Sequence, residues 1–129
     1  MSNRVDEGVL AYLGKAIWTL LVREYLVEEK SIDKLEDLQK ESLKYIGVKA
    51  QSSIFIELLG NRFFTSEEIE VYKRGRNFQS VVQSKNFDFQ SYRVSTGFEV
   101  LIGHWHIEKQ KERIEKLWEK VKTMIENKE

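Results

Sequence analysis

Two apolar stretches of the sequence each contain one formal charge. Residues 9–22 include Lys15, with Thr19 four positions later, and residues 94–107 include Glu99. Residues four apart lie on the same face of an α-helix. Buried charges are costly unless they pair with each other or reach water. We therefore expect Lys15 to pair with Glu99, or both side chains to line a wet cleft.

A compact basic cluster, KRGRN at residues 73–77, leads into a polar stretch that contains Lys85. Basic side chains at the C-terminal end of a helix complement its dipole, and such a cluster is often simply solvated. The same residue types also contact the phosphates of nucleic acids. Composition alone leaves both interpretations open.

Two short motifs resemble known sites but lack essential parts. The GKA motif around Lys15 has the lysine of a phosphate-binding loop, but Gly8 lies one position too far back and Ala16 has no hydroxyl for magnesium. His104 and His106 are two residues apart, so they point to different faces of a helix, and the sequence offers no evident third ligand. We expect both histidines to be ordinary packing or surface residues.

Six helices are predicted to position these residues. Helical spacing of apolar residues and stops at Gly47 and Gly60 define most of them. Thr65 with Glu68 three residues later forms a capping box, and Asp88 is a candidate N-cap. The predicted helices span residues 6–29, 31–47, 48–60, 65–76 and 88–109, followed by a sixth with an apolar stripe of Ile114, Leu117, Trp118, Val121 and Ile125.

The composition favours an all-α protein with one domain over residues 1–129. The chain is 41% hydrophobic and 33% charged, with 21 basic and 21 acidic residues, so it is not uniformly basic. It contains no proline, few glycines and no cysteine, which disfavours strands and excludes disulfides and thiolate metal sites. The segments 9–22 and 94–107 are apolar nearly all round and are predicted to be central helices, and residues 77–87 are the predicted loop.

The first residues lack the basic-then-apolar layout of a signal peptide. The longest apolar run, residues 9–22, is shorter than the roughly 20 residues that span a membrane. We expect a cytoplasmic protein with no membrane partner.

Three segments, in order, resemble the signatures of one family. AYLGKAIWTLLVREYL at residues 11–26 is similar to the first signature of Mini-ribonuclease III, KRGRN to its basic loop motif, and DFQSYRVSTGFEVLIGHWHI at residues 88–107 to its second signature. These proteins are small members of the ribonuclease III family without a separate double-stranded-RNA-binding domain. The resemblance implies an all-α, ribonuclease III-type helical endonuclease domain, usually a homodimer with a groove for duplex RNA. It also implies magnesium-dependent hydrolysis of RNA, often of ribosomal RNA precursor.

The chain departs from this family at its catalytic positions. Lys15 stands where the family has a magnesium-binding aspartate, Thr19 where it usually has a glutamate, and Gln39 where a histidine is common. Glu99 matches the other catalytic carboxylate. Magnesium takes hard oxygen ligands, usually with one or two carboxylates, and an ammonium repels it. We therefore expect no metal cofactor, or at most binding through Glu99, with Lys15 taking the metal's place.

The resemblance then favours a hydrolytically inactive protein that still binds structured or double-stranded RNA. The residues expected to contact RNA are Lys73, Arg74, Arg76, Asn77 and Lys85. Two alternatives stay open: an active magnesium-dependent endoribonuclease, and a structural or heterodimerising interaction module.

Overall fold

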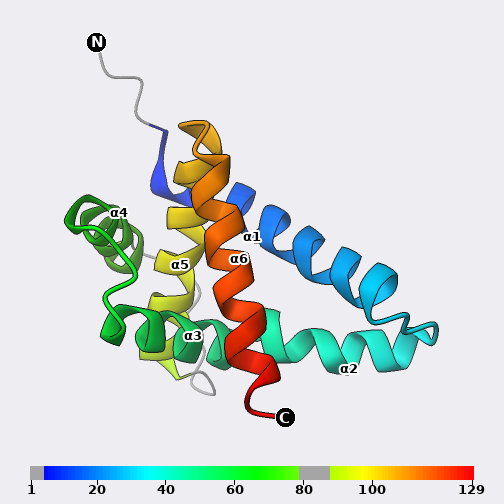
Figure 1. Ribbon diagram of the computed structural model, residues 1–129. Helices are drawn as coiled ribbons and strands as arrows, with labels where there is room; N and C mark the ends of the chain where they lie inside the picture. Colours follow the sequence, from blue (N-terminus) through cyan, green and yellow to red (C-terminus); the bar gives the residue numbers. More distant parts are fainter. Residues whose placement is uncertain (1–4, 79–87) are drawn as a thin grey trace.

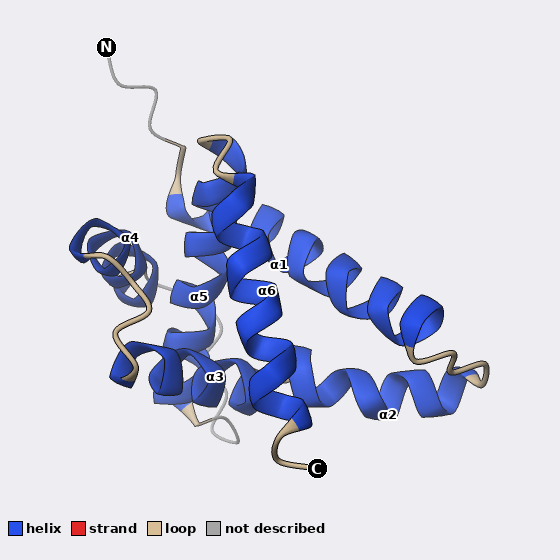
Figure 2. Cartoon of the chain, viewed as in Figure 1, coloured by secondary structure: helices blue, strands red, loops and turns tan. Residues whose placement is uncertain are grey.

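The computed structural model describes residues 5–78 and 88–129, and these form helices joined by short turns, with no strand among them (Figure 2). The elements are α1 (Glu7–Glu24), the short π-helix η1 (Tyr25–Glu29), α2 (Leu35–Ile46), α3 (Val48–Gly60), α4 (Ser66–Asn77), α5 (Phe89–Ile107) and α6 (Lys111–Glu126). The predicted all-α class is confirmed.

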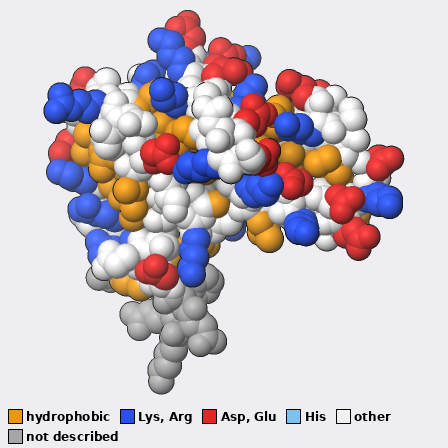
Figure 3. Space-filling model, turned by 60° about the horizontal axis from the view of Figure 1, so that its bottom comes forward, with side chains coloured by type: hydrophobic (Ala, Val, Ile, Leu, Met, Phe, Trp, Pro, Cys, Tyr) orange, Lys and Arg blue, Asp and Glu red, His pale blue; other side chains and the backbone are white. Residues whose placement is uncertain are grey.

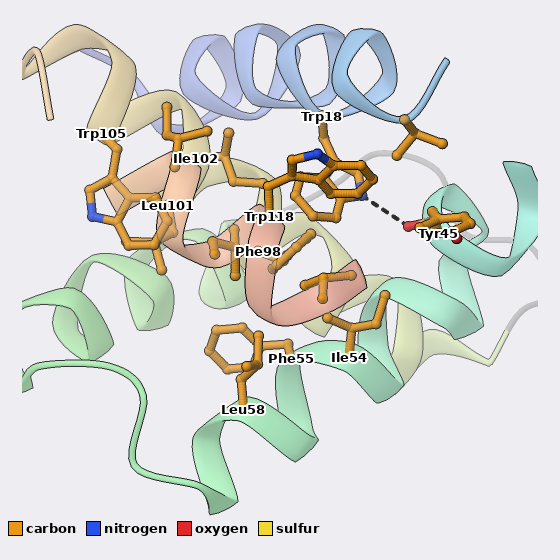
Figure 4. Close-up of a cluster of buried hydrophobic side chains, with 14 of the residues drawn as sticks. Trp18, Tyr45, Ile54, Phe55, Leu58, Phe98, Leu101, Ile102, Trp105 and Trp118 are labelled. Atoms are coloured by element: carbon orange, nitrogen blue, oxygen red, sulfur yellow. Dashed lines mark hydrogen bonds between the residues drawn. The ribbon is translucent and has the colours of Figure 1, made fainter. Parts of the chain in front are cut away.

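The helix α5 runs through the middle of the molecule and packs against α1, α3, α4 and α6 (Figure 1). Eight of its residues are buried, as its apolar sequence predicts. Phe98 of α5 lies edge-on to Trp18 of α1, with 5.1 Å between ring centroids. Trp18 in turn donates from Nε1 to the carbonyl oxygen of Tyr45 at 2.9 Å (Figure 4). The other helices that bear candidate site residues are thus positioned against α5.

Glycines allow α1 to approach α5 at backbone distance. A Cβ atom on Gly14 would lie 1.8 Å from the carbonyl oxygen of Glu99, and one on Gly103 would lie 2.1 Å from that of Leu10. No side chain fits at either position without moving a backbone. This crossing brings Lys15, the residue that follows Gly14, next to Glu99.

The helices α4 and α5 cross just as closely. A Cβ atom on Gly75 would lie 2.6 Å from Cβ of Val100, and one on Gly97 would lie 2.6 Å from Cδ1 of Tyr72. This crossing places the basic end of α4 beside the first turns of α5.

The predicted caps of these two helices are confirmed. Thr65 Oγ1 accepts a hydrogen bond from the Glu68 amide at 3.1 Å, and Glu68 Oε1 accepts one from the Thr65 amide at 3.0 Å. Asp88 Oδ1 accepts from the amides of Gln90 and Ser91 at 3.1 and 3.2 Å. Each cap satisfies amides that have no partner within the helix.

Two predicted features of the N-terminal half are wrong. The second helix begins at Leu35 rather than at residue 31, because Ser31 has a φ of 54°, in the left-handed region that an α-helix cannot include. The first helix is not buried all round: Val9, Tyr12 and Leu20 are 52%, 82% and 58% exposed. Its apolar residues therefore form two faces, one in the core and one at the surface.

The remaining predictions concern the C-terminal half. The predicted stripe of α6 is buried apart from Ile125, which is partly exposed, and Met124 joins it. The predicted loop starts later than expected because Asn77 still belongs to α4, and residues 79–87 lie outside the described part of the chain. Among the described residues, no helix is long and apolar enough to cross a membrane.

Candidate functional site

Glu99 is held from inside the protein by a buried side chain of α3. Gln51, 2% exposed, donates from Nε2 to Ser95 Oγ at 2.7 Å and to Glu99 Oε2 at 3.1 Å. Burial raises the pKa of the Glu99 carboxyl, while the Gln51 hydrogen bond and the charge of Lys15 partly oppose this rise. The carboxylate thus has a fixed position and a nearby positive charge.

Lys15 is exposed on α1. It follows Gly14, which packs against the backbone of Glu99, and its side chain reaches solvent. Its charge acts on Glu99 through space, yet within the described chain the two do not form an ion pair at contact distance. The expected ion pair is therefore not formed among the described residues, and a wet cleft shared by the two charges stays a prediction. Thr19, one turn later, is partly buried.

The residues around Glu99 do not fit a magnesium ion. Magnesium sites in proteins rely on carboxylates and water in a near-octahedral arrangement. Here Glu99 has the positive charge of Lys15 nearby, and in the described ranges no three His, Cys, Asp or Glu residues gather where they could hold a metal. The positive charge beside Glu99 comes from Lys15 itself.

Gln51 is a site residue that sequence reasoning missed. A signal for it exists, because Gln51 precedes Ile54, Phe55 and Leu58 at the helical spacing that defines the buried face of α3. A polar residue at such a position needs a buried partner. Gln39, by contrast, is exposed on α2.

The basic cluster KRGRN forms the last turns of α4, as predicted for all of its residues except Asn77. Two of its members pair with glutamates: Lys73 Nζ lies 3.6 Å from Glu70 Oε2, and Arg74 Nε lies 3.4 Å from Glu7 Oε1. The cluster therefore offers less net charge than its sequence suggests. The expected RNA contact Lys85 lies outside the described residues.

The remaining members of the cluster meet Arg93 of α5. Arg93 donates from Nε to the carbonyl oxygen of Arg76 at 3.0 Å and from Nη2 to Asn77 Oδ1 at 2.9 Å. Arg76 donates from Nε to the same Asn77 Oδ1 at 3.3 Å. Only the close crossing of α4 and α5 makes Arg93 a member of this cluster.

The histidines do not come together as a pair: His104 is partly buried and His106 is exposed.

The charged side chains are unevenly distributed over the surface. Figure 3 shows one face of the molecule, on which basic side chains are more numerous on the side of α4 and acidic ones on the side of the α1–α2 hairpin. A net charge of zero thus hides an uneven distribution.

Comparisons with known proteins point to one family. A family model of the ribonuclease III domain matches residues 8–110. A Mini-ribonuclease 3 of Enterococcus faecalis is 44% identical over 108 residues, which cover 84% of this chain and 81% of that protein. A Mini-ribonuclease 3 of Staphylococcus aureus is 39% identical over 132 aligned residues, covering 97% and 98%.

A crystal structure of a Fusobacterium nucleatum protein has the same fold. It superposes with a TM-score of 0.80 and covers 98% of this chain and 97% of its own, at 24% sequence identity. The domain match and the identity and coverage of the two relatives show that the chain belongs to the Mini-ribonuclease III group of the ribonuclease III family.

Proposed function

We propose that the protein binds structured or double-stranded RNA and does not hydrolyse it. The observation that carries the proposal is the exposed ammonium of Lys15 acting on Glu99, at the position where the family signature has aspartate. Cleavage in this family needs a magnesium ion that activates water and offsets charge on the phosphoryl group. With Lys15 beside it, Glu99 has a positive neighbour without any metal.

The RNA-binding half of the proposal rests on the end of α4. Lys73, Arg74, Arg76 and Asn77 lie together there, with Lys85 as a further expected contact from the sequence. Contacts to phosphates give affinity that falls with salt and carry little sequence information. Duplex RNA is recognised mainly by its shape, phosphates and 2′-hydroxyls. Binding therefore does not depend on the chemistry that Lys15 removes.

We also propose that the protein acts as a homodimer in the cytoplasm, as a single ribonuclease III-like domain over residues 1–129. Support for the dimer comes from the outer face of α1, where Val9, Tyr12 and Leu20 are exposed on one helical stripe, continued by Val27 of η1. Exposed apolar stripes of this kind mark protein interfaces. A second copy of the chain is the partner that covers this α1 stripe.

The alternative of an active endoribonuclease, acting on ribosomal precursor or other duplex RNA, needs further metal ligands near Glu99. Two acidic residues of the described chain that could be considered for this role are engaged elsewhere: Asp88 caps α5, and Glu7 pairs with Arg74. One feature favours this alternative, namely that Gln51 still holds Glu99 in place.

A binding and cleavage experiment tests the proposal. The protein is titrated into labelled duplex RNA at several salt concentrations, with and without magnesium, and the RNA is then analysed for cleavage. We expect salt-dependent binding that does not require magnesium, and intact RNA. Magnesium-dependent cleavage supports the active enzyme instead, and the lack of any duplex binding at low salt supports the interaction module.

A further inference from the structure

We propose that Arg76 and Arg93 form a clasp for a single phosphate of the RNA backbone, with Asn77 as the bridge between them. This clasp rests on the proposed RNA binding and assigns to it a specific pair of residues, one from α4 and one from α5. Lys73 and Arg74, the other basic members of the cluster, take a smaller part.

Two like charges converge on one neutral oxygen in this clasp. Asn77 Oδ1 accepts from Arg76 Nε at 3.3 Å and from Arg93 Nη2 at 2.9 Å. Within the described residues, neither guanidinium belongs to an ion pair. Two adjacent cations without an acidic partner repel each other, and an anion bound between them removes that repulsion.

The two other basic residues of the cluster differ from the clasp because each has an acidic partner. Lys73 lies beside Glu70 and Arg74 beside Glu7, so each must give up a glutamate before it binds a phosphate. The two guanidinium groups of the clasp have no such competitor in the described part of the chain. Arginine also suits phosphate better than lysine does, because its planar fork donates two parallel hydrogen bonds.

Packing holds both guanidinium groups in place before any ligand arrives. Arg76 lies over the ring of Tyr72, 5.7 Å from its centroid, and Arg93 lies over Phe89 at 5.9 Å. The bond from Arg93 Nε to the Arg76 carbonyl oxygen, at 3.0 Å, ties the two helices together. Both arginines are nevertheless partly exposed and Asn77 is exposed, so a ligand reaches them from solvent. Ordered side chains lose little entropy on binding.

The clasp and Glu99 lie on the same helix. Arg93 and Glu99 share α5 and are six residues apart, which corresponds to about 9 Å along the helix axis and a rotation of about 120° around it. A phosphate held by the clasp therefore lies beside the helix that carries Glu99, but not on the same face of it.

The test is the affinity for one labelled duplex RNA, measured by fluorescence anisotropy over a range of salt concentrations. The variants are Arg93→Gln, Arg76→Gln, Arg93→Lys and Lys73→Gln, with Lys120→Gln, an exposed lysine of α6, as the matched control for charge. We expect Arg93→Gln and Arg76→Gln each to weaken binding about ten-fold. Each should also lower, by about one unit, the steepness with which the logarithm of the affinity falls with the logarithm of the salt concentration (the salt slope). Lys73→Gln should weaken it about two-fold, and Arg93→Lys should fall between these values because it keeps the charge but loses the fork.

A purely structural role for Arg93 predicts a different pattern. Arg93 also braces the end of α4, so a loss of folding would lower the thermal midpoint together with affinity. Asn77→Ala removes the bridge but keeps both charges, and it should leave the salt slope unchanged. If the wild-type protein binds duplex RNA but Arg93→Gln behaves like Lys120→Gln, the clasp is wrong and the proposed function stands. If the wild-type protein binds no duplex RNA, the proposed function itself fails.

Discussion

At the scale of single residues, Glu99 and Lys15 differ in how they meet solvent. Glu99 is largely enclosed and fixed by Gln51, whereas Lys15 stays in water and acts on Glu99 at a distance. An exposed charge is screened, so Lys15 cannot fully offset the cost of burying the carboxylate. Ionisation of Glu99 therefore lowers the stability of the folded protein.

This cost leads to a prediction for Glu99→Gln. Burial raises the pKa of Glu99 above the ordinary 4.5, so the folded state favours the protonated carboxyl. The contribution of this group to the free energy of unfolding is therefore fully present below pH 4.5 and is lost as the pH rises through the folded-state pKa. The variant removes the charge and keeps an oxygen that accepts from Gln51. Its thermal midpoint should exceed that of the wild type by about 2–4 °C near neutral pH. The difference should shrink below pH 4.5.

The matched control is Glu115→Gln, an exposed glutamate of α6. It should leave the thermal midpoint nearly unchanged across the same pH range. A midpoint that stays the same or falls in Glu99→Gln near neutral pH would contradict the account of the buried carboxylate.

Sequence reasoning found Lys15, Thr19 and Glu99 because each stands at a signature position. It left open whether Lys15 pairs with Glu99 or reaches water, because apolar residues that face a core and those that face solvent look alike in one sequence. Gln51 was missed although its spacing marked it as buried. The contact of Arg93 with the basic cluster was not predicted, since contacts between helices depend on tertiary packing.

At the scale of elements, two close crossings on α5 position the candidate site. The α1 crossing brings Lys15 to Glu99, and the α4 crossing brings Arg76 to Arg93. Both crossings depend on glycines that the sequence shows within its signatures. Their role was not predictable from sequence, because a glycine within a helical pattern does not reveal which helix it faces.

Gly14→Ala tests the α1 crossing. The added Cβ would lie 1.8 Å from the carbonyl oxygen of Glu99, a backbone atom, so the helices must move apart. Such overpacking should lower the free energy of unfolding by about 1–3 kcal/mol or more. Urea denaturation followed by circular dichroism measures it.

Gly60→Ala provides the control for this change, because nothing lies within 4 Å of the added Cβ at the end of α3. Alanine has the higher helix propensity, so stability should stay the same or rise by up to about 1 kcal/mol. Equal effects of the two substitutions would contradict the role of Gly14 in helix packing.

The helix boundaries that could be predicted were those marked by local chemistry. The Thr65–Glu68 capping box and the Asp88 cap were correct because their hydrogen bonds lie within four residues of sequence. The start of α2 was not, because Ser31 adopts a left-handed conformation that its residue type does not signal.

At the scale of the whole molecule, the α1 stripe predicts an interface. We expect a homodimer by light scattering at micromolar concentration. Tyr12→Glu, at the most exposed large apolar position of the stripe, should raise the dimer dissociation constant at least about ten-fold because it places a charge in a desolvated interface.

The control for this variant is Ile56→Glu, which changes an exposed apolar residue of α3 outside the stripe. It should leave the dimer intact. A wild-type protein that is monomeric at all concentrations, or a Tyr12→Glu variant that remains dimeric, would contradict the proposed interface.

The most direct measurement of the central claim is cleavage of a long duplex RNA in magnesium. It compares the wild-type protein with Lys15→Asp, alone and together with Thr19→Glu, and uses Glu99→Gln as the control for contaminating nuclease. We expect the wild-type protein to leave the RNA intact and Lys15→Asp to cut it, because aspartate restores a second carboxylate beside Glu99. Magnesium-dependent cleavage by the wild-type protein, abolished by Glu99→Gln, would contradict the account.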